Sequence, residues 1–112
     1  MSKGYQLDQL KTLLGGNPET IREFVAFLQD DLPVQMTTLQ HQVMHQAWED
    51  AAITAHGIKV QLKYLAAEEA AALALWIENE AGGSDIQGLQ SMVSDLAEAI
   101  AVICIGLRNE HQ

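Results

Sequence analysis

The sequence predicts a single all-α domain over residues 1–112, an up-down-up-down four-helix bundle preceded by a short extra N-terminal helix. Alanine and leucine are abundant and β-branched runs are few, a composition that favours helices. Apolar residues recur at steps of three and four along most of the chain, which is the spacing of helices that bury one face. The breaks between these segments are short, and short loops place successive helices antiparallel.

The first two helices have clear starts or stops. A short helix is expected from Tyr5 to Leu14, where a pair of glycines ends it. Asn17 and Pro18 then provide an N-cap and a first helical residue for a long helix. Pro33 lies inside its apolar face. A proline in a regular helix interior lowers the stability of the helix by roughly 3 kcal/mol. We therefore expect either a kink at Pro33 or two abutting helices that share the face.

Three further helices are expected in the second half of the chain. The apolar pattern changes phase near residues 45–47, and a helix follows from Trp48 to Ala67. Another begins at Glu68-Glu69 and stops at Gly82-Gly83. Ser84 or Asp85 caps the last helix, whose apolar stripe continues to residue 107.

The charge and the cysteine content restrict the classes of function. A formal net charge of −9 argues against nucleic-acid binding and against attraction to an anionic membrane. Cys104 is the single cysteine, so it forms no internal disulfide, and we interpret it as structural. The first residues lack the apolar core of a signal peptide, and segment 96–107, interrupted by Glu98, is too short to span a bilayer. We expect a cytoplasmic protein, and its Met1 start and compact length favour one that stands alone.

The helix expected from Trp48 carries an outward-facing histidine. With about 100° per residue, His56 lies about 140° from the middle of the helix's core stripe. Lys59 and Lys63 follow it on the same outward side, at i+3 and i+7. An exposed imidazole beside two ammonium groups is a candidate site for a phosphoryl group, which lysines bind through charge-assisted hydrogen bonds. The stripe itself consists of Ala51, Ala55, Ile58, Leu62 and Leu65.

The chemistry that this site would perform is nucleophilic. A histidine with an ordinary pKa of about 6.5 is largely neutral in a cytoplasm, and a neutral ring nitrogen attacks an activated phosphoryl group. The chain has no glycine-rich nucleotide cradle, so we expect the phosphoryl donor to be another protein, and we expect no cofactor. Ile53, Val60 and Tyr64 lie about 40–80° round the helix from His56 and form a possible docking patch.

Simpler interpretations apply to several of these residues. An exposed histidine with two lysines is usually only a solvated surface, and Lys63 could equally pair with Glu49 or another acidic residue. His41 and His45 stand at i and i+4, with Glu49 a further turn on, a spacing that could bind a metal. Because no second ligand pair follows elsewhere, we interpret them as a polar surface and expect no metal site. Glu78 is interpreted as a surface charge.

A family resemblance rests on the same helix. Ala55-His56-Gly57-Ile58-Lys59, followed by Leu65-Ala66-Ala67, resembles the motif of histidine-containing phosphotransfer (HPt) domains. That motif is A-H-x-L-K-G, then a small residue three positions on, then a hydrophobic–Gly–Ala turn. The similarity extends over nearly the whole chain, since Phe24 to Pro33 resembles the family's second helix and Trp48 to Ala51 resembles the lead-in to its histidine helix.

The resemblance implies a phosphorelay function in two-component signalling. HPt domains are four-helix bundles that carry a phosphoryl group, as phosphohistidine, between aspartates of response-regulator receiver domains. By this resemblance His56 is the phosphoryl acceptor and Lys59 a supporting lysine. The partners implied are receiver domains and a hybrid sensor histidine kinase, and we expect the chain to act as a monomer and as a phosphoryl carrier rather than a true catalyst.

The chain departs from the family pattern close to the histidine. Val60 stands where the family has glycine, Lys63 occupies a small-residue position, and Ala66 replaces the glycine of the closing turn. Gly57 is also unusual, because a glycine within a helix costs roughly 1 kcal/mol relative to alanine. We hypothesise that Gly57 offsets the bulk of Val60 and that Lys63 adds a phosphate contact.

Two alternative functions remain open from the sequence. A non-catalytic adaptor would bind a receiver or kinase through the same bundle without accepting phosphate, and Val60 favours this hypothesis. A helical oligomer would use the apolar flank of the histidine helix as a subunit interface.

Overall fold

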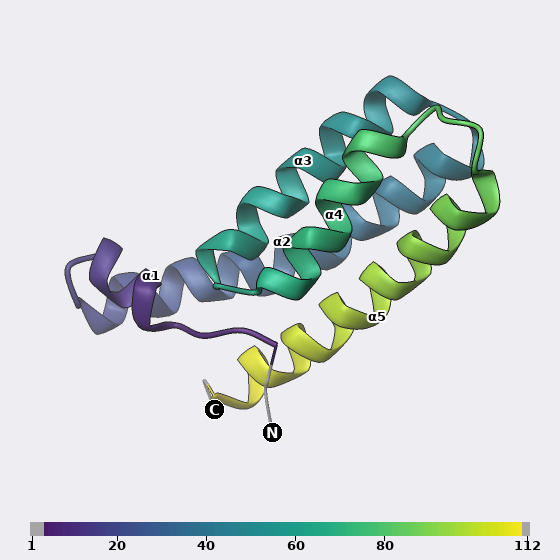
Figure 1. The fold of residues 1–112 in the computed structure, drawn as a ribbon. Helices are drawn as coiled ribbons and strands as arrows, with labels where there is room; N and C mark the ends of the chain where they lie inside the picture. Colours follow the sequence, from purple (N-terminus) through teal and green to yellow (C-terminus); the bar gives the residue numbers. More distant parts are fainter. Residues whose placement is uncertain (1–3, 111–112) are drawn as a thin grey trace.

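The computed structural model describes residues 4–110, and every regular element within them is an α-helix (Figure 1). This confirms the predicted all-α class. The elements are α1 (Asp8–Leu13), α2 (Pro18–Met44), α3 (Trp48–Tyr64), α4 (Glu68–Glu80) and α5 (Ile86–Glu110). α2 packs against α3 and α5, and α4 packs against the same two helices, so each long helix contacts two others around one core. The short α1 lies against the beginning of α2.

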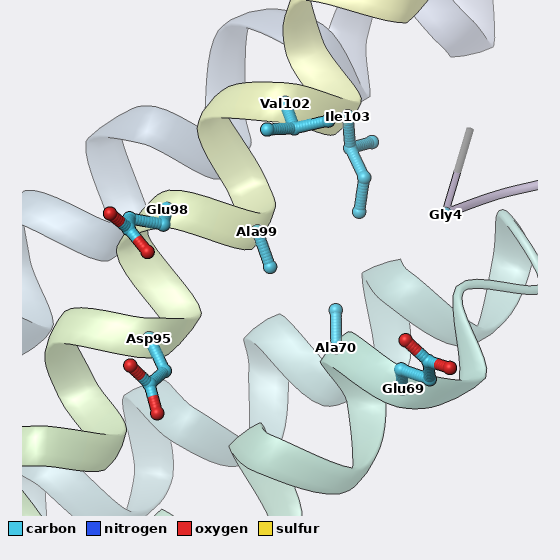
Figure 2. A pocket seen from close by; sticks show the side chains of 8 residues that line it. All are labelled: Gly4, Glu69, Ala70, Asp95, Glu98, Ala99, Val102 and Ile103. Atoms are coloured by element: carbon cyan, nitrogen blue, oxygen red, sulfur yellow. The ribbon is translucent and has the colours of Figure 1, made fainter. Parts of the chain in front are cut away.

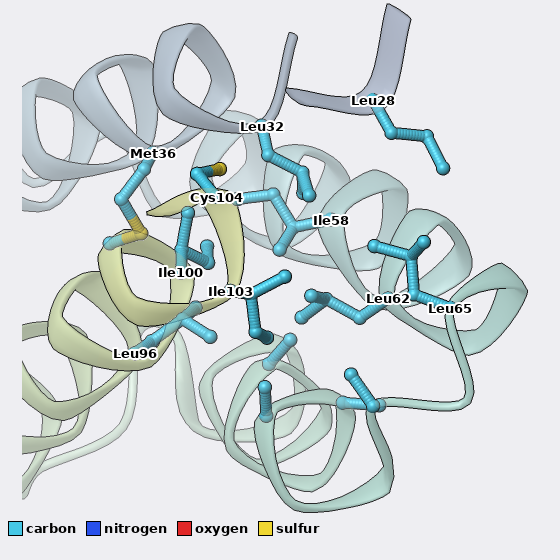
Figure 3. Packing of buried hydrophobic residues seen from close by; sticks show 14 of the residues in the cluster. Leu28, Leu32, Met36, Ile58, Leu62, Leu65, Leu96, Ile100, Ile103 and Cys104 are labelled. Carbon is cyan, nitrogen blue, oxygen red and sulfur yellow. The ribbon is translucent and has the colours of Figure 1, made fainter. Parts of the chain in front are cut away.

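The core forms where the apolar faces of the long helices meet. The whole predicted stripe of α3, from Ala51 to Leu65, is buried, which confirms the helical phase on which the outward position of His56 depends. Apolar burial of this kind is the main favourable term in folding. Figure 3 shows side chains of α2, α3 and α5 meeting in this core, among them Leu28, Leu32, Met36, Ile58, Leu62, Leu96 and Ile100.

α2 begins as predicted and continues through its internal proline. The Asn17 side-chain oxygen accepts hydrogen bonds from the backbone N–H groups of Glu19 (3.0 Å) and Thr20 (3.2 Å). The helix is continuous from Pro18 to Met44, so the expected alternative of two abutting helices is wrong. Because Pro33 has no N–H, the carbonyl of Gln29 loses its usual helical donor.

Cys104 compensates for that loss. Its thiol, on α5, donates a hydrogen bond to the Gln29 carbonyl oxygen over an S···O distance of 3.7 Å. Burial raises the pKa of this thiol, which keeps it protonated and able to donate. The structural role predicted for Cys104 therefore has a specific physical basis.

The N-terminal helix is shorter than predicted. α1 begins at Asp8, so the expectation of a helix from Tyr5 is wrong at its first turn. The preceding residues form tertiary contacts instead. The Gln6 N–H donates to the Leu65 carbonyl (2.8 Å), and the Tyr5 hydroxyl donates to the Glu110 carboxylate (2.7 Å). Burial and the neighbouring carboxylate both raise the pKa of Tyr5, so this hydroxyl stays protonated.

The boundaries of the other helices differ from the prediction by a few residues. α3 ends at Tyr64 rather than Ala67, because Ala66 adopts a left-handed backbone with φ of 50°. The turn is closed by a hydrogen bond from the Ala67 N–H to the Leu62 carbonyl (3.0 Å). At α5, the Asp85 side chain accepts from the Gly88 N–H (2.9 Å) and is the residue that caps the helix.

α5 is longer than its predicted apolar stripe. By length and composition alone its 25 residues could cross a membrane, whereas the sequence prediction considered only the shorter segment 96–107. In this structure 33% of the most apolar window of α5 is buried. The helix therefore supplies one side of the core and also exposes apolar surface.

The left-handed Ala66 generates a stability prediction. Replacing Ala66 with glycine removes the steric cost of φ above zero for a residue with a Cβ, about 1–2 kcal/mol, against a smaller entropic loss in the unfolded chain. We expect Ala66→Gly to raise the free energy of unfolding by about 0.5–1 kcal/mol in urea denaturation. The matched control is Ala72→Gly on the exposed side of α4, which should lower it by about 1 kcal/mol. If both variants lowered the free energy of unfolding, the inference that the backbone of Ala66 is strained would be wrong.

Candidate functional site

His56 lies on the outer side of α3 and contacts α4. Its side chain is 55% exposed, as the helical phase predicted. Its Nδ1 atom lies 3.0 Å from Oε2 of Glu78, a residue of α4. The other ring nitrogen, Nε2, has no hydrogen-bond partner among residues 4–110. Glu78 thus holds the ring at Nδ1, and Nε2 is available to a partner.

Glu78 also binds the first of the two predicted lysines. The Lys59 ammonium donates to Oε1 of Glu78 over 3.0 Å, and the Lys59 side chain is only 14% exposed. The two oxygens of one carboxylate are therefore divided between His56 and Lys59. Lys59 is beside the histidine as predicted, but its charge is directed at Glu78.

The sequence interpretation of Glu78 as a surface charge missed this contact. α3 and α4 form a helical hairpin around the turn at Leu65–Ala67, and His56 and Glu78 are each eleven residues from Ala67. Residues equally distant from a tight turn lie side by side in an antiparallel hairpin. Counting outward from the turn was therefore the signal that could have found Glu78.

The electrostatics of Glu78 determine which nitrogen of His56 carries the proton. The Lys59 hydrogen bond lowers the pKa of Glu78 most, burial opposes this effect, and the His56 contact lowers the pKa further. Glu78 is therefore a carboxylate at neutral pH and can only accept hydrogen bonds. The Nδ1 atom of a neutral His56 must then be the donor, which leaves the lone pair on Nε2.

Lys63 differs from Lys59 in its surroundings. It is exposed on the last turn of α3. Among the residues that the structure describes it forms no ion pair, so the alternative pairing with Glu49 is not found. An exposed ammonium group two turns from His56 remains available to an incoming anion.

The predicted apolar flank of α3 is exposed and continues onto α2. Ile53, Val60 and Tyr64 are all exposed, as expected from the helical phase. The Tyr64 ring packs edge-on against Phe24 of α2, with 5.4 Å between ring centroids. Phe27, one turn further along α2, is a neighbour of Phe24 and is also exposed. Apolar surface thus extends from the side of His56 across two helices.

Gly57 has no structural reason within the chain to be a glycine. It is exposed, its backbone is helical, and a Cβ atom built at this position meets nothing within 4 Å. Alanine would favour the helix by roughly 1 kcal/mol without a clash. The fold therefore does not require a glycine at position 57, and the effect of this glycine is to leave open space on the surface beside His56.

The histidines at the end of α2 form a separate cluster. The rings of His41 and His45 are stacked with centroids 6.3 Å apart, and Nδ1 of His45 lies 2.8 Å from the His41 carbonyl oxygen. Within residues 4–110, no group of three or more His, Cys, Asp or Glu side chains is arranged to hold a metal ion.

Comparison with known protein families, curated proteins and solved structures finds no match to this chain.

The carboxylate between His56 and Lys59 should make stability pH-dependent. Because the pKa of Glu78 is lower in the folded chain than its ordinary value, ionised Glu78 stabilises the fold above that ordinary value. This contribution is lost as the pH falls through the folded-state pKa. Glu78→Gln should therefore lower the free energy of unfolding by up to about 1 kcal/mol at about pH 7. The difference in unfolding free energy between the wild type and this variant should be smaller at about pH 3.

The control for this measurement is Glu80→Gln, since Glu80 forms no ion pair within the described chain. Urea denaturation of the three proteins at both pH values gives the comparison. An effect of Glu78→Gln that is equal at the two pH values would show that the ionised carboxylate contributes nothing.

Proposed function

We propose that this chain is a phosphorelay intermediate of the HPt type, an up-down-up-down four-helix bundle acting in two-component signalling. His56 accepts a phosphoryl group from a receiver-domain aspartate and passes it to the aspartate of another receiver. The observation that carries the proposal is the contact of Glu78 with Nδ1, which leaves the exposed Nε2 as the nucleophile. The resemblance of the α3 sequence to the HPt motif supports the same role.

The transfer step follows from the orientation of the ring. The Nε2 lone pair attacks the phosphorus atom of an aspartyl phosphate, and the bond from phosphorus to the aspartate oxygen breaks. The aspartate leaves as a free carboxylate, and the phosphoryl group remains on Nε2. Positive charge develops on the ring, and Glu78 stabilises it by accepting the Nδ1–H hydrogen bond. Glu78 acts through His56 and is a positioning residue.

The two lysines then have different roles. A phosphoryl group carries roughly −1.5 to −2 charges, so an unpaired carboxylate next to it would be unfavourable. Lys59 neutralises Glu78 through its 3.0 Å hydrogen bond and so limits this repulsion. Lys63 is exposed and unpaired within residues 4–110, and it supplies the positive charge that the phosphoryl group meets directly.

The partner docks on the apolar flank beside the ring. Ile53, Val60 and Tyr64 present exposed apolar surface to the matching surface of a receiver domain or of a hybrid sensor kinase. Gly57 allows the partner's backbone to come close to Nε2 next to the bulkier Val60. This exchange between proteins needs no cofactor on the chain, and the proposed location is the cytoplasm.

One observation favours a second candidate function. Val60 is exposed on the turn after His56, where the HPt motif has glycine, and its branched side chain restricts approach to the ring. An adaptor that binds a receiver or kinase through the same flank without accepting phosphate would tolerate this residue. The Glu78 contact is unnecessary for an adaptor and useful for a nucleophile, which is why we prefer the relay.

The first functional prediction concerns the phosphoryl adduct. Incubation with a panel of phosphorylated receiver domains should give an acid-labile adduct on the wild-type chain, and NMR of ¹⁵N-histidine should locate it on Nε2. His56→Ala should give no adduct. A chain that binds receivers but stays unmodified across the panel would select the adaptor and exclude the relay.

The same transfer assay tests the role of Glu78, with Glu80 as the control. Loss of a group that orients a catalytic base or nucleophile usually slows a reaction by at least roughly tenfold. We expect this reduction in the transfer rate for Glu78→Gln and none for Glu80→Gln. Equal rates in the two variants would remove Glu78 from the mechanism.

The second functional prediction concerns Gly57. Gly57→Ala should raise the free energy of unfolding by about 1 kcal/mol, because alanine favours the helix and meets no neighbour. The same variant should transfer phosphate more slowly, because the added methyl group obstructs the partner. Ser91→Ala, on the exposed side of α5, is the control that favours the helix without touching this surface. Faster or unchanged transfer by Gly57→Ala would refute the close-approach role.

A further inference from the structure

α5 exposes an apolar surface on the side of the bundle away from His56. Only 33% of its most apolar window is buried. Val102 and Ile105 are 59% and 54% exposed. Figure 1 shows α5 on the opposite side of α4 from α3, which carries His56. This surface therefore lies apart from the proposed phosphotransfer site.

The flank of α5 that faces α4 is acidic. A groove of about 410 Å³ lies between the two helices, and Figure 2 shows the carboxylates of Glu69, Asp95 and Glu98 around it. Val102 lines the same groove. If two copies of the chain met through this flank, like charges would face each other, which costs free energy.

The flank that faces α2 has a different character. A groove of about 360 Å³ lies between α2 and α5, with Pro33 and Thr37 on one side and Ala97, Ala101 and Ile105 on the other. The one charged residue that lines it is Arg108. This groove is apolar at its centre and positively charged at one end.

An exposed row of residues on α5 begins at Glu98, at the border of the acidic flank, continues along the second flank and is self-complementary. Glu98, Ala101, Ile105 and Arg108 follow each other at steps of 3, 4 and 3 and lie within about 80° of the helix surface. In an antiparallel pair of α5 helices related by a two-fold axis at residue 103, Glu98 faces Arg108 and Ala101 faces Ile105. Neither Glu98 nor Arg108 has an ion-pair partner among the residues that the structure describes.

We propose that a second copy of this chain docks on α5 through this row. Ile105 of each copy enters the α2–α5 groove of the other beside the small Ala101, and two Glu98–Arg108 ion pairs close the ends. Such an interface is isologous, as in most symmetric dimers. It is also short, so the dimer is weak and reversible. The dimer replaces the monomer expected from the sequence, and it leaves both His56 rings open to partners.

The test is sedimentation equilibrium of the whole chain from roughly 10 μM to roughly 1 mM, the range in which a small interface associates. We expect a concentration-dependent dimer for the wild type. Glu98→Arg and Arg108→Glu each bring like charges together and should weaken the dimer at least roughly tenfold. An equimolar mixture of these two variants pairs opposite charges again and should form a heterodimer, and the double variant should form a homodimer.

Two apolar positions on α5, one inside the proposed interface and one outside it, test whether this particular surface forms the dimer. Ile105→Glu should abolish the dimer, whereas Ile86→Glu, at the exposed first turn of the same helix and far from the axis at residue 103, should leave it intact. Circular dichroism confirms that each variant is folded. A wild type that stays monomeric throughout the range overturns the proposal, as does a mixture of the charge variants that fails to associate.

A lipid surface is the other class of partner that would cover an apolar helix face. A monomeric wild type that co-sediments with phosphatidylcholine vesicles, and loses this binding on Ile105→Glu, would assign the face to lipid and refute the dimer. None of these measurements uses phosphorylation, so their outcome is independent of the role of His56.

Discussion

The register of α3 against α4 is the constraint on which the site depends. The turn at Leu65–Ala67 sets this register, and the N-terminal segment supports the turn through the hydrogen bond from Gln6 to Leu65. A shift by one residue would carry Glu78 about 100° around its helix and away from His56. The left-handed conformation of Ala66 is part of the turn whose register places the Glu78 carboxylate beside the imidazole.

The carboxylate performs two electrostatic tasks at once. It assigns the proton of a neutral His56 to Nδ1, and it draws the Lys59 ammonium group into a partly buried position. The site has no net excess of negative charge, because the lysine and the carboxylate compensate each other. A chain with a formal charge of −9 can thus present a locally neutral or positive surface to a phosphoryl group, since exposed charges are screened within about 10 Å.

Sequence patterns predicted the parts of this structure that depend on local periodicity. The cap at Asn17, the buried stripe of α3 and the exposure of His56 all follow from the spacing of residues along a single helix. The contact between His56 and Glu78 depends on how two helices align, and a surface glutamate looks the same with or without such a partner. The start of α1 was placed too early for a similar reason, because nothing in the local sequence shows that the Tyr5 hydroxyl reaches Glu110 at the far end of the chain.

The proline in α2 has a consequence for how the chain tolerates substitution. The Gln29 carbonyl needs a donor only because Pro33 has no N–H, and Cys104 provides that donor from another helix. Residues 33 and 104, far apart in sequence, therefore act as one unit, and their substitutions are energetically non-additive. A thiol in a helix core acquires a hydrogen-bonding role once the carbonyl beside it has lost its helical donor to a proline, so the two positions are expected to vary together in proteins that keep this fold.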